Sequence, residues 1–221
     1  MLPLFHYFKR KELLCVLQKA FPRECEEDVA AVVNRLSLTK KGRDTLSYYT
    51  NKRLTAGEIS YTLLTGERVT LPYRLYIDER RGDAEQGLSE RQRFIYHALF
   101  SRSYDGCTRE KHAKALITHH SPAWVIPYIL ELSGEYVKEI LEAVYRRLST
   151  VNTIPYRRVC ALNFERTTRL HARMICYWNE RYRYECYRYR DYIGKRLFAE
   201  CFGYRKTGQK KIELYERKQQ K

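Results

Sequence analysis

The chain contains 221 residues, and its 42 lysines and arginines outnumber its 26 aspartates and glutamates, which gives a formal charge of +16. A hydrophobic content of 44% is enough to build a buried core, so the composition excludes wholesale disorder. The longest apolar run, residues 123–130, is far shorter than the roughly 20 residues of a membrane-spanning helix, and we expect no membrane contact. Seven widely spaced cysteines do not suggest a disulfide framework and favour a reducing, cytoplasmic location.

Short helices are expected in the first fifty residues. Apolar side chains recur at three- and four-residue spacing between residues 8 and 21, and Pro22 ends the pattern. A second helix is expected to begin near Asp28, and Leu46 with Tyr49 indicates a third. The chain therefore begins as a helical region.

The apolar period then changes from that of a helix to that of a strand. Apolar and polar residues alternate over residues 58–63 and 69–77, on either side of a Thr65-Gly66 turn. This pattern predicts a β-hairpin. Because Pro72 lacks an amide donor, its strand is expected at the edge of the sheet.

A charged, glycine-containing stretch over residues 78–87 is the best candidate for a hinge or boundary. It suggests a division into residues 1–83, with the N-terminal helices and the hairpin, and residues 84–221, a helical region with a basic C-terminal segment. The predicted fold class is mainly α: a multi-helix bundle with one small N-terminal β-hairpin.

Helix-start signals divide the second region. A capping-box pattern at Ser89 opens a helix that ends near Gly106, and Thr108 is placed to cap the next one. Ser121 followed by proline predicts the start of the longest helix, which reaches about Leu148. Pro127 and the Ser133-Gly134 pair, both within this helix, are positions where it could bend.

The last 66 residues carry 18 basic and 7 acidic side chains, which accounts for +11 of the total charge. If Asn163 caps a helix, a 100° rotation per residue separates two faces. The expected core face contains Phe164, Thr168, His171, Ile175, Trp178, Tyr182 and Cys186. The opposite face is a basic stripe that contains Arg166, Arg169, Arg173, Tyr177, Tyr184 and Arg188, with Glu180 its only acid.

Arginines neutralise phosphates and tyrosine rings stack on bases, a combination found in proteins that hold single-stranded or irregular nucleic acid. We therefore expect a protein that binds DNA or RNA, mainly through backbone and stacking contacts with little base readout. The stacking residues are expected to be Tyr177 and Tyr184. The expected phosphate contacts are Arg166, Arg169, Arg173, Arg188, Arg190, Lys195 and Arg196.

Two other interpretations of the basic stripe remain open. Glu131, Glu135, Glu139 and Glu142 follow one face of the preceding helix and could pair with the arginines inside the molecule, or the stripe could bind an acidic protein. The Arg-Tyr alternation over residues 181–190 also fits a strand, which would place tyrosines and arginines on opposite faces.

Two further functions are alternatives to nucleic-acid binding. The chain could be an interaction or scaffold subunit that uses residues 124–148 and the edge strand 69–77. A metal-dependent nuclease would need clustered carboxylates, for which Asp78 and Glu79 are the nearest approach. Phosphate-binding loops, nucleophile elbows and zinc-helix motifs are absent from the sequence, so we expect no enzyme activity, no cofactor and no metal site.

Overall fold

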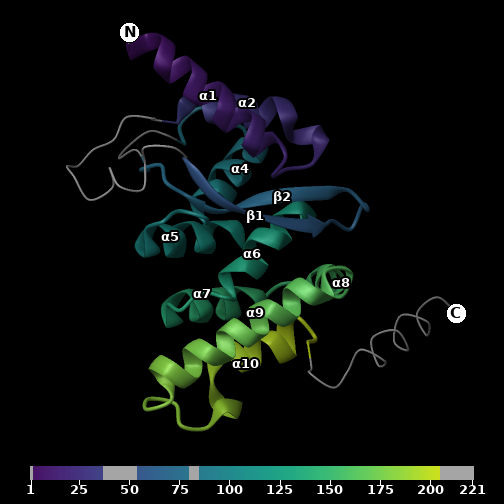
Figure 1. Cartoon of the computed structure of the whole chain (residues 1–221). Coiled ribbons are helices and arrows are strands. Elements are labelled where there is room, and N and C mark those ends of the chain that lie inside the picture. Colours follow the sequence, from purple (N-terminus) through teal and green to yellow (C-terminus); the bar gives the residue numbers. More distant parts are fainter. Residues whose placement is uncertain (1, 37–53, 80–84, 205–221) are drawn as a thin grey trace, which may run out of the picture.

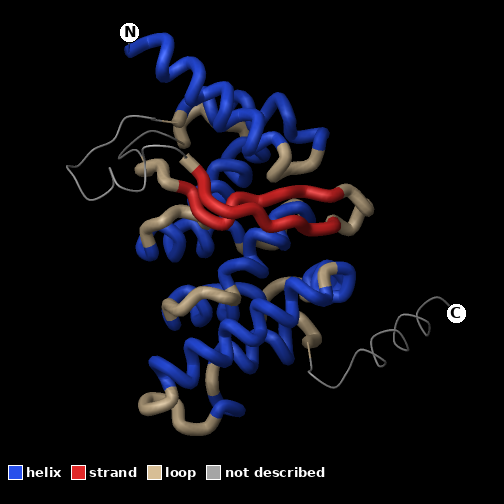
Figure 2. Tube along the Cα trace, in the orientation of Figure 1, coloured by secondary structure: helices blue, strands red, loops and turns tan. Residues whose placement is uncertain are grey.

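The computed structural model describes residues 2–36, 54–79 and 85–204, with side-chain detail from residue 10 onward. These residues form nine α-helices and one two-stranded antiparallel sheet, which confirms a mainly helical fold with a small β-hairpin (Figures 1 and 2). The elements are α1 (Leu2–Gln18), α2 (Glu26–Arg35), β1 (Thr55–Thr62), β2 (Arg68–Leu75), α4 (Glu90–Phe100), α5 (Gly106–Leu116), α6 (Ile126–Leu132), α7 (Lys138–Leu148), α8 (Ile154–Leu162), α9 (Phe164–Tyr177) and α10 (Ile193–Arg196).

The hairpin crosses the middle of the molecule, between the pair α1 and α2 and the helix α6 (Figure 1). Ile59 lies opposite Leu71 and Tyr61 opposite Val69, and all four side chains are buried. The alternation expected from the sequence thus produces one core-facing surface of the sheet. Because this face packs on helices, the hairpin does not have to be stable alone.

The outer edge of β2 is partly occupied by main chain from two other segments. Leu75 donates its amide to the carbonyl of Arg102 at 2.8 Å and accepts from the Tyr104 amide at 3.0 Å. At the other end of the strand, the amide of Thr70 donates to the Lys19 carbonyl at 2.6 Å. No further strand joins the hairpin among the described residues, as the proline at position 72 predicts.

The prediction of one long helix between residues 122 and 148 is wrong. A single 3₁₀ turn (Ala123–Val125) leads into α6, and the helix stops before α7 begins at Lys138. The hydroxyl of Ser133 bonds back to the Leu130 carbonyl at 2.6 Å. A Cβ at Gly134 would lie 2.6 Å from Leu170 Cδ2, so α9 packs against this glycine more closely than any side chain permits.

Two of the expected helix starts also need correction, while a third is confirmed. Ser89 and Gln92 form both bonds of the capping box, and α4 then ends at Phe100 instead of near residue 106. The next helix is capped by Asp105, whose carboxylate accepts from the Thr108 amide at 2.7 Å. Ser121 does not cap a helix: its hydroxyl donates to the carbonyl of residue 116 and closes the preceding turn.

The predicted core face of α9 is confirmed in part: Phe164, Ile175, Trp178, Tyr182 and Cys186 are partly buried and pack against the core. Thr167, Leu170 and Met174 are the buried residues of the helix, whereas Thr168 is exposed and His171 is half-buried. The helix continues through a π turn, Trp178–Tyr182. The wider turn changes the angular phase of every residue after it, which a constant 100° rotation cannot reproduce.

Beyond the π turn, residues 183–188 form turns and irregular chain, and Tyr189–Asp191 form a single 3₁₀ turn. The strand considered for residues 181–190 is therefore wrong, and so is a helix continuous to residue 190. The third helix expected around Leu46 and Tyr49 lies outside the described residues, as do residues 80–84 of the expected boundary.

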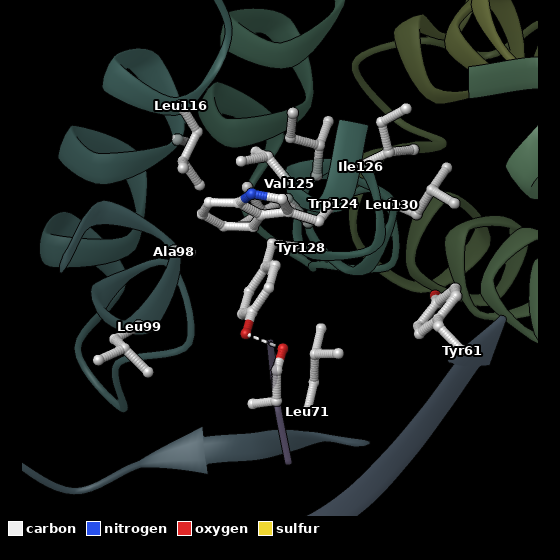
Figure 3. Packing of buried hydrophobic residues seen from close by; sticks show 14 of the residues in the cluster. Tyr61, Leu71, Ala98, Leu99, Leu116, Trp124, Val125, Ile126, Tyr128 and Leu130 are labelled. Carbon is white, nitrogen blue, oxygen red and sulfur yellow. Dashed lines mark hydrogen bonds between the residues drawn. The ribbon is translucent and has the colours of Figure 1, made fainter. Parts of the chain in front are cut away.

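Aromatic and aliphatic side chains fill the core between α4, α5 and α6 (Figure 3). The ring of Tyr128 stacks on Phe21 with the centroids 5.4 Å apart, and its hydroxyl donates to the Ala20 carbonyl at 2.8 Å. Trp124 meets the same phenylalanine edge-on. Most apolar side chains of residues 124–148 are thus committed to the interior. Across the described helices, none is long and apolar enough to cross a membrane.

Candidate nucleic-acid interface

A buried ion pair joins α6, α9 and the hairpin. Glu131 accepts hydrogen bonds from the Tyr61 hydroxyl at 2.6 Å and from Arg166 Nε and Nη2 at 2.7 and 2.5 Å. Burial by itself raises the pKa of Glu131, but the hydrogen bonds and charge of Arg166 outweigh it, and the pKa lies below its ordinary value. One carboxylate thus has one arginine and one hydroxyl, and its charge is balanced.

One turn later in the chain, a second buried carboxylate has more arginines than it can neutralise. Nη2 of Arg74 lies 3.0 Å from both carboxylate oxygens of Glu135. Arg109 Nη2 lies 3.3 Å from Oε2, and Arg102 Nη1 lies 3.9 Å from Oε1. We call these four residues the Glu135 cluster. Three guanidinium groups from β2 and from both sides of the α4–α5 connection converge on one carboxylate.

The fully buried member of this cluster is Arg102, whose side chain is 1% exposed. Its Nη2 donates to the Tyr73 carbonyl at 2.7 Å, whereas Nε and Nη1 have no hydrogen-bond partner. Arg109 donates from Nη1 to the Ser103 and Tyr104 carbonyls, and its Nε is likewise without a partner. Burial lowers the pKa of Arg102, which reflects the cost of holding this charge away from water.

Next to this cluster, tyrosine rings and guanidinium groups form a series across β2, α9, the α6–α7 connection and the π turn. Arg173 on α9 donates to the Tyr73 hydroxyl at 3.2 Å, and its Cζ lies 5.6 Å from the Tyr73 ring and 6.0 Å from the Tyr177 ring. The Tyr177 and Tyr136 centroids are 6.0 Å apart, and Arg181 lies 5.3 Å from the Tyr136 ring. We call this continuous series of five residues the Tyr-Arg ladder. Such contacts hold the rings in place through cation–π attraction.

The chain after the ladder exposes further rings and charges. Tyr184 is 97% exposed and Tyr187 is 75% exposed, and Arg183 lies 5.9 Å from the Tyr187 ring. Arg188 and Arg190 are also exposed. Bare tyrosine rings at the surface are costly to hydrate and are suited to stacking on a partner.

The structure separates the predicted site residues into three groups. Arg173 and Tyr177 belong to the ladder, and Tyr184, Arg188 and Arg190 lie in the exposed segment that follows it. Arg169 is exposed on α9 beside Glu165, and Lys195 is half-buried. Arg166 pairs with the buried Glu131, and the exposed Arg196 pairs with Glu200 and donates to the Tyr145 hydroxyl. Arg169 and Arg190 likewise have surface ion pairs, with Glu165 and Asp191.

The internal-pairing interpretation holds for one of its four glutamates. Glu131 pairs with the stripe through Arg166, whereas Glu135 takes arginines from outside the stripe. Glu139 is exposed, and Glu142 lies 3.9 Å from Lys138. The break between α6 and α7 explains the difference, because the four carboxylates no longer share one helix face.

Sequence patterns did not identify Tyr73, Arg74, Tyr136 or Arg181 as members of this surface, nor Arg102 and Arg109 as members of the cluster. Tyr73 and Arg74 are neighbours in β2, and because successive strand residues point to opposite faces, alternation along the strand did not place both here. For Tyr136, the Ser133-Gly134 pair marked a place where the chain could leave the helix. The two arginines of the cluster have no comparable signal, since their burial depends on contacts with other segments.

The acidic pair considered for metal-dependent cleavage has other partners. Asp78 accepts from the Tyr104 hydroxyl at 2.7 Å, and Glu79 lies 2.6 Å from Lys111 Nζ and 3.1 Å from His112 Nε2. The two residues point to different neighbours. Within the described ranges, no group of three or more histidine, cysteine, aspartate or glutamate side chains is arranged to hold a metal ion.

His112 also contacts a second histidine. The Nδ1 atoms of His97 and His112 are 2.9 Å apart, and Nε2 of His97 lies 3.7 Å from Glu85. Burial lowers the pKa of His112 to about 4 despite the nearby Glu79 carboxylate. The pair is therefore neutral at physiological pH and connects α4 to α5.

No known protein family, no curated protein and no solved structure matches this chain. The chemistry of the ladder and of the Glu135 cluster thus provides the basis for assigning a function. All cysteines within the described part of the chain are free thiols.

Proposed function

We propose that this protein binds single-stranded or irregular nucleic acid at the Tyr-Arg ladder, through phosphate and stacking contacts with little base readout. The observation that carries the proposal is the continuous series of rings and guanidinium groups from Tyr73 to Arg181, with the rings of Tyr177 and Tyr136 in contact at its middle. Rings with this spacing accept successive bases of any sequence, and arginines between them contact the backbone.

The charge balance around the ladder supports this assignment. The buried carboxylate of Glu135 acts on Arg173 through its charge, but it already has three arginines around it and is 2% exposed, so it cannot neutralise Arg173 as well. Tyr136 is 43% exposed, which leaves ring surface free for a base. The positive charge of the ladder is therefore available to a polyanion and would give salt-dependent affinity.

The segment after the π turn extends the same chemistry. Tyr184 and Tyr187 are the two most exposed large apolar side chains among the described residues, and Arg188 lies next to them in the chain. Binding would order these side chains against the strand of nucleic acid. We therefore propose that the rings of Tyr136, Tyr177, Tyr184 and Tyr187 stack on bases. The expected backbone contacts are Arg173, Arg181, Arg183 and Arg188.

Fluorescence anisotropy with a labelled single-stranded 12-mer, of both DNA and RNA, tests the proposal. The double variant Tyr136→Ala/Tyr177→Ala removes two rings and should weaken binding about tenfold to several-hundredfold. Arg181→Glu should weaken binding and make it less steeply dependent on salt. Arg158→Glu is the matched control, because Arg158 is exposed on α8 and away from the ladder.

Equal losses in Arg158→Glu and Arg181→Glu would show that only overall charge matters and would contradict a ladder site. Binding of the double variant with wild-type affinity would do the same. Circular dichroism of each variant establishes that the fold is retained before affinities are compared.

A second candidate function, as an interaction subunit, has one observation in its favour. Ile154 and Leu162 on α8 are 59% and 54% exposed, and their spacing of eight residues places them on one helix face. This face is more available than residues 124–148, where Trp124 is buried. Ile154→Lys/Leu162→Lys should abolish self-association or partner capture without changing nucleic-acid affinity, as measured by sedimentation velocity and anisotropy.

A further inference from the structure

We propose that the Glu135 cluster binds a phosphate-class oxyanion through Arg74, Arg102 and Arg109. This site is distinct from the ladder contacts and does not depend on them, although Tyr73 touches both. The ring of Tyr73 lies 4.6 Å from Arg74 Cζ and 5.9 Å from Arg102 Cζ, and its carbonyl accepts from Arg102.

The buried charges around the Glu135 cluster do not balance. Four arginines, Arg74, Arg102, Arg109 and Arg166, contact only two carboxylates, Glu131 and Glu135. Arg166 pairs directly with Glu131, and the charge of Glu131 also acts on Arg102, so the four guanidinium groups carry a surplus of two positive charges over the two carboxylates. The side chains of Arg102, Arg109 and Glu135 are all at most 3% exposed. An uncompensated buried ion costs several kcal/mol, so a fold that keeps two of them is expected to supply a counterion.

The second argument is the set of unused donors. In the Glu135 cluster, three buried nitrogen atoms have no hydrogen-bond partner: Nε and Nη1 of Arg102 and Nε of Arg109. Buried guanidinium donors without partners are rare in native proteins. The side-by-side fork of an arginine consists of Nε and Nη2, as Arg166 shows at Glu131, and Nη2 of Arg102 already donates to the Tyr73 carbonyl. Arg102 therefore offers Nε and Nη1 as separate single donors to an anion.

A water molecule could accept from these donors but would leave the charge surplus unchanged. A carboxylate side chain would remove part of the surplus, but Glu135 is the only one in contact with these arginines within the described residues, and it is already shared among three of them. A tetrahedral oxyanion with two negative charges satisfies both requirements at once. This chemistry selects phosphate and its close analogues over chloride.

An anion would enter this site past Arg74 and Tyr73. Arg74 is 14% exposed and is the most exposed arginine of the cluster, and Tyr73 is half-buried beside it. The incoming anion can be free phosphate or the terminal phosphate of a nucleic acid held on the ladder. Both sources present the same oxygens to the same guanidinium groups.

The test begins with thermal unfolding of the full chain in phosphate and in chloride at matched ionic strength. Phosphate at ten times its Kd should raise the Tm by about 3–6 °C, because a ligand that binds only the folded state stabilises it by mass action. Chloride should give no comparable shift. Isothermal titration calorimetry should give one high-affinity phosphate per chain.

Arg102→Lys keeps the positive charge but removes the planar guanidinium with its Nε and Nη1 donors, and it should weaken phosphate binding at least about tenfold. Arg74→Lys, at the partly exposed rim, is the second variant in case the first fails to fold. Arg158→Lys is the control and should bind phosphate as the wild type does, since Arg158 is an exposed residue of α8.

Oligonucleotides of one sequence with a 5′-phosphate, a 3′-phosphate or no terminal phosphate distinguish the two sources. If the anion belongs to a nucleic acid, one phosphorylated end should bind at least about tenfold more tightly, and Arg102→Lys should abolish only that increment. If the anion is free phosphate, all three oligonucleotides should bind alike while the phosphate-dependent Tm shift persists.

Equal Tm values in phosphate and chloride would overturn the proposal without any variant. Undiminished phosphate affinity in both Arg102→Lys and Arg74→Lys would also overturn it, because the anion would then bind elsewhere. Neither outcome affects the ladder, whose test relies on Tyr136, Tyr177 and Arg181. Failure of the anion site and failure of the proposed function can therefore be told apart.

Discussion

Glu131 and Glu135 are four residues apart and both are buried, yet their surroundings differ in kind. Glu131 has a bidentate arginine and a tyrosine hydroxyl, and its charge is matched. Glu135 has three arginines, two of which retain donors without partners. The first arrangement is complete as it stands, whereas the second is completed by an added anion.

A buried arginine therefore does not by itself indicate a structural or a functional role. Arg166 was expected to contact nucleic acid, and its guanidinium is instead committed to a carboxylate. Arg102 and Arg109 were not expected to take part in any site, and they carry the surplus charge. The number of acids within reach of each guanidinium separates the two cases.

The largest expected effect comes from breaking the balanced pair. Glu131→Ala leaves Arg166 and the Tyr61 hydroxyl without their shared acceptor, and we expect a loss of about 3–5 kcal/mol in the free energy of unfolding. Urea unfolding followed by circular dichroism measures it. Glu139→Ala, at an exposed carboxylate of α7, should change stability by less than about 0.5 kcal/mol. Similar losses of stability in Glu131→Ala and Glu139→Ala would show that the buried pair of Glu131 does not stabilise the fold more than an exposed carboxylate does.

Acid unfolding tests the ion pair of Glu131, but the stability also depends on pH through His112. The contribution of His112 is therefore separated first. Its pKa of about 4 in the folded state lies below the ordinary value of 6.5, so between these pH values only the unfolded chain binds the proton. Stability should therefore fall by about 3 kcal/mol as the pH drops from 7 to 4. His112→Asn should flatten this part of the curve, and His119→Asn, at an exposed histidine, should not.

The contribution of Glu131 falls in a lower pH range. Its pKa is below the ordinary carboxyl value, so its stabilisation persists at mildly acidic pH and disappears as the pH falls through that lowered pKa. After His112→Asn, Glu131→Ala should remove part of the remaining acid sensitivity, while Glu79, Asp105 and Glu200, whose pKa values are also lowered, keep the rest. A remaining curve that is unchanged by Glu131→Ala would contradict the balanced pair.

The break between the two glutamates can be tested through Gly134. A Cβ at this position would lie 2.6 Å from Leu170 Cδ2, so Gly134→Ala should destabilise the fold by about 1–3 kcal/mol through overpacking. Combining it with Leu170→Ala should recover part of that loss, as measured by a double-mutant cycle. Additive losses would show that the close approach of α9 does not determine the break.

The smallest effect on stability is expected for a change within the Glu135 cluster. Arg102→Met removes one uncompensated buried charge along with its bond to the Tyr73 carbonyl, and in phosphate-free buffer these terms should cancel to within about 1 kcal/mol. Arg166→Met should cost about 3–5 kcal/mol, because it leaves Glu131 buried and unpaired. If urea unfolding gives equal losses of stability for Arg102→Met and Arg166→Met, the Glu131 ion pair and the Glu135 cluster do not differ in charge balance.

The sequence was sufficient wherever structure depends on nearby residues. The hairpin, its turn and the capping box at Ser89 were predicted correctly, because alternation and side-chain caps are local. The basic helix that begins at Phe164 was also predicted, together with Arg173 and Tyr177, which contribute to the ladder.

The sequence was insufficient where structure depends on distant contacts. The break at Gly134 depends on Leu170, and Asn163 pairs its amide with the main chain of Thr62 instead of capping a helix. The π turn after Tyr177 then moved the later residues of the stripe away from their expected face. The Glu135 cluster assembles side chains from three segments, and no periodicity in one segment reveals such a meeting.

The most direct test of the central claim is a crystal structure of the protein grown without phosphate or sulfate and soaked in selenate near the measured phosphate Kd. Selenium supplies an anomalous signal that identifies the anion. The account predicts one anomalous peak within hydrogen-bond distance of Arg102 and Arg109, with Glu135 still bound to Arg74. Anomalous peaks only at exposed arginines, with Glu135 turned to satisfy Arg102, would contradict it.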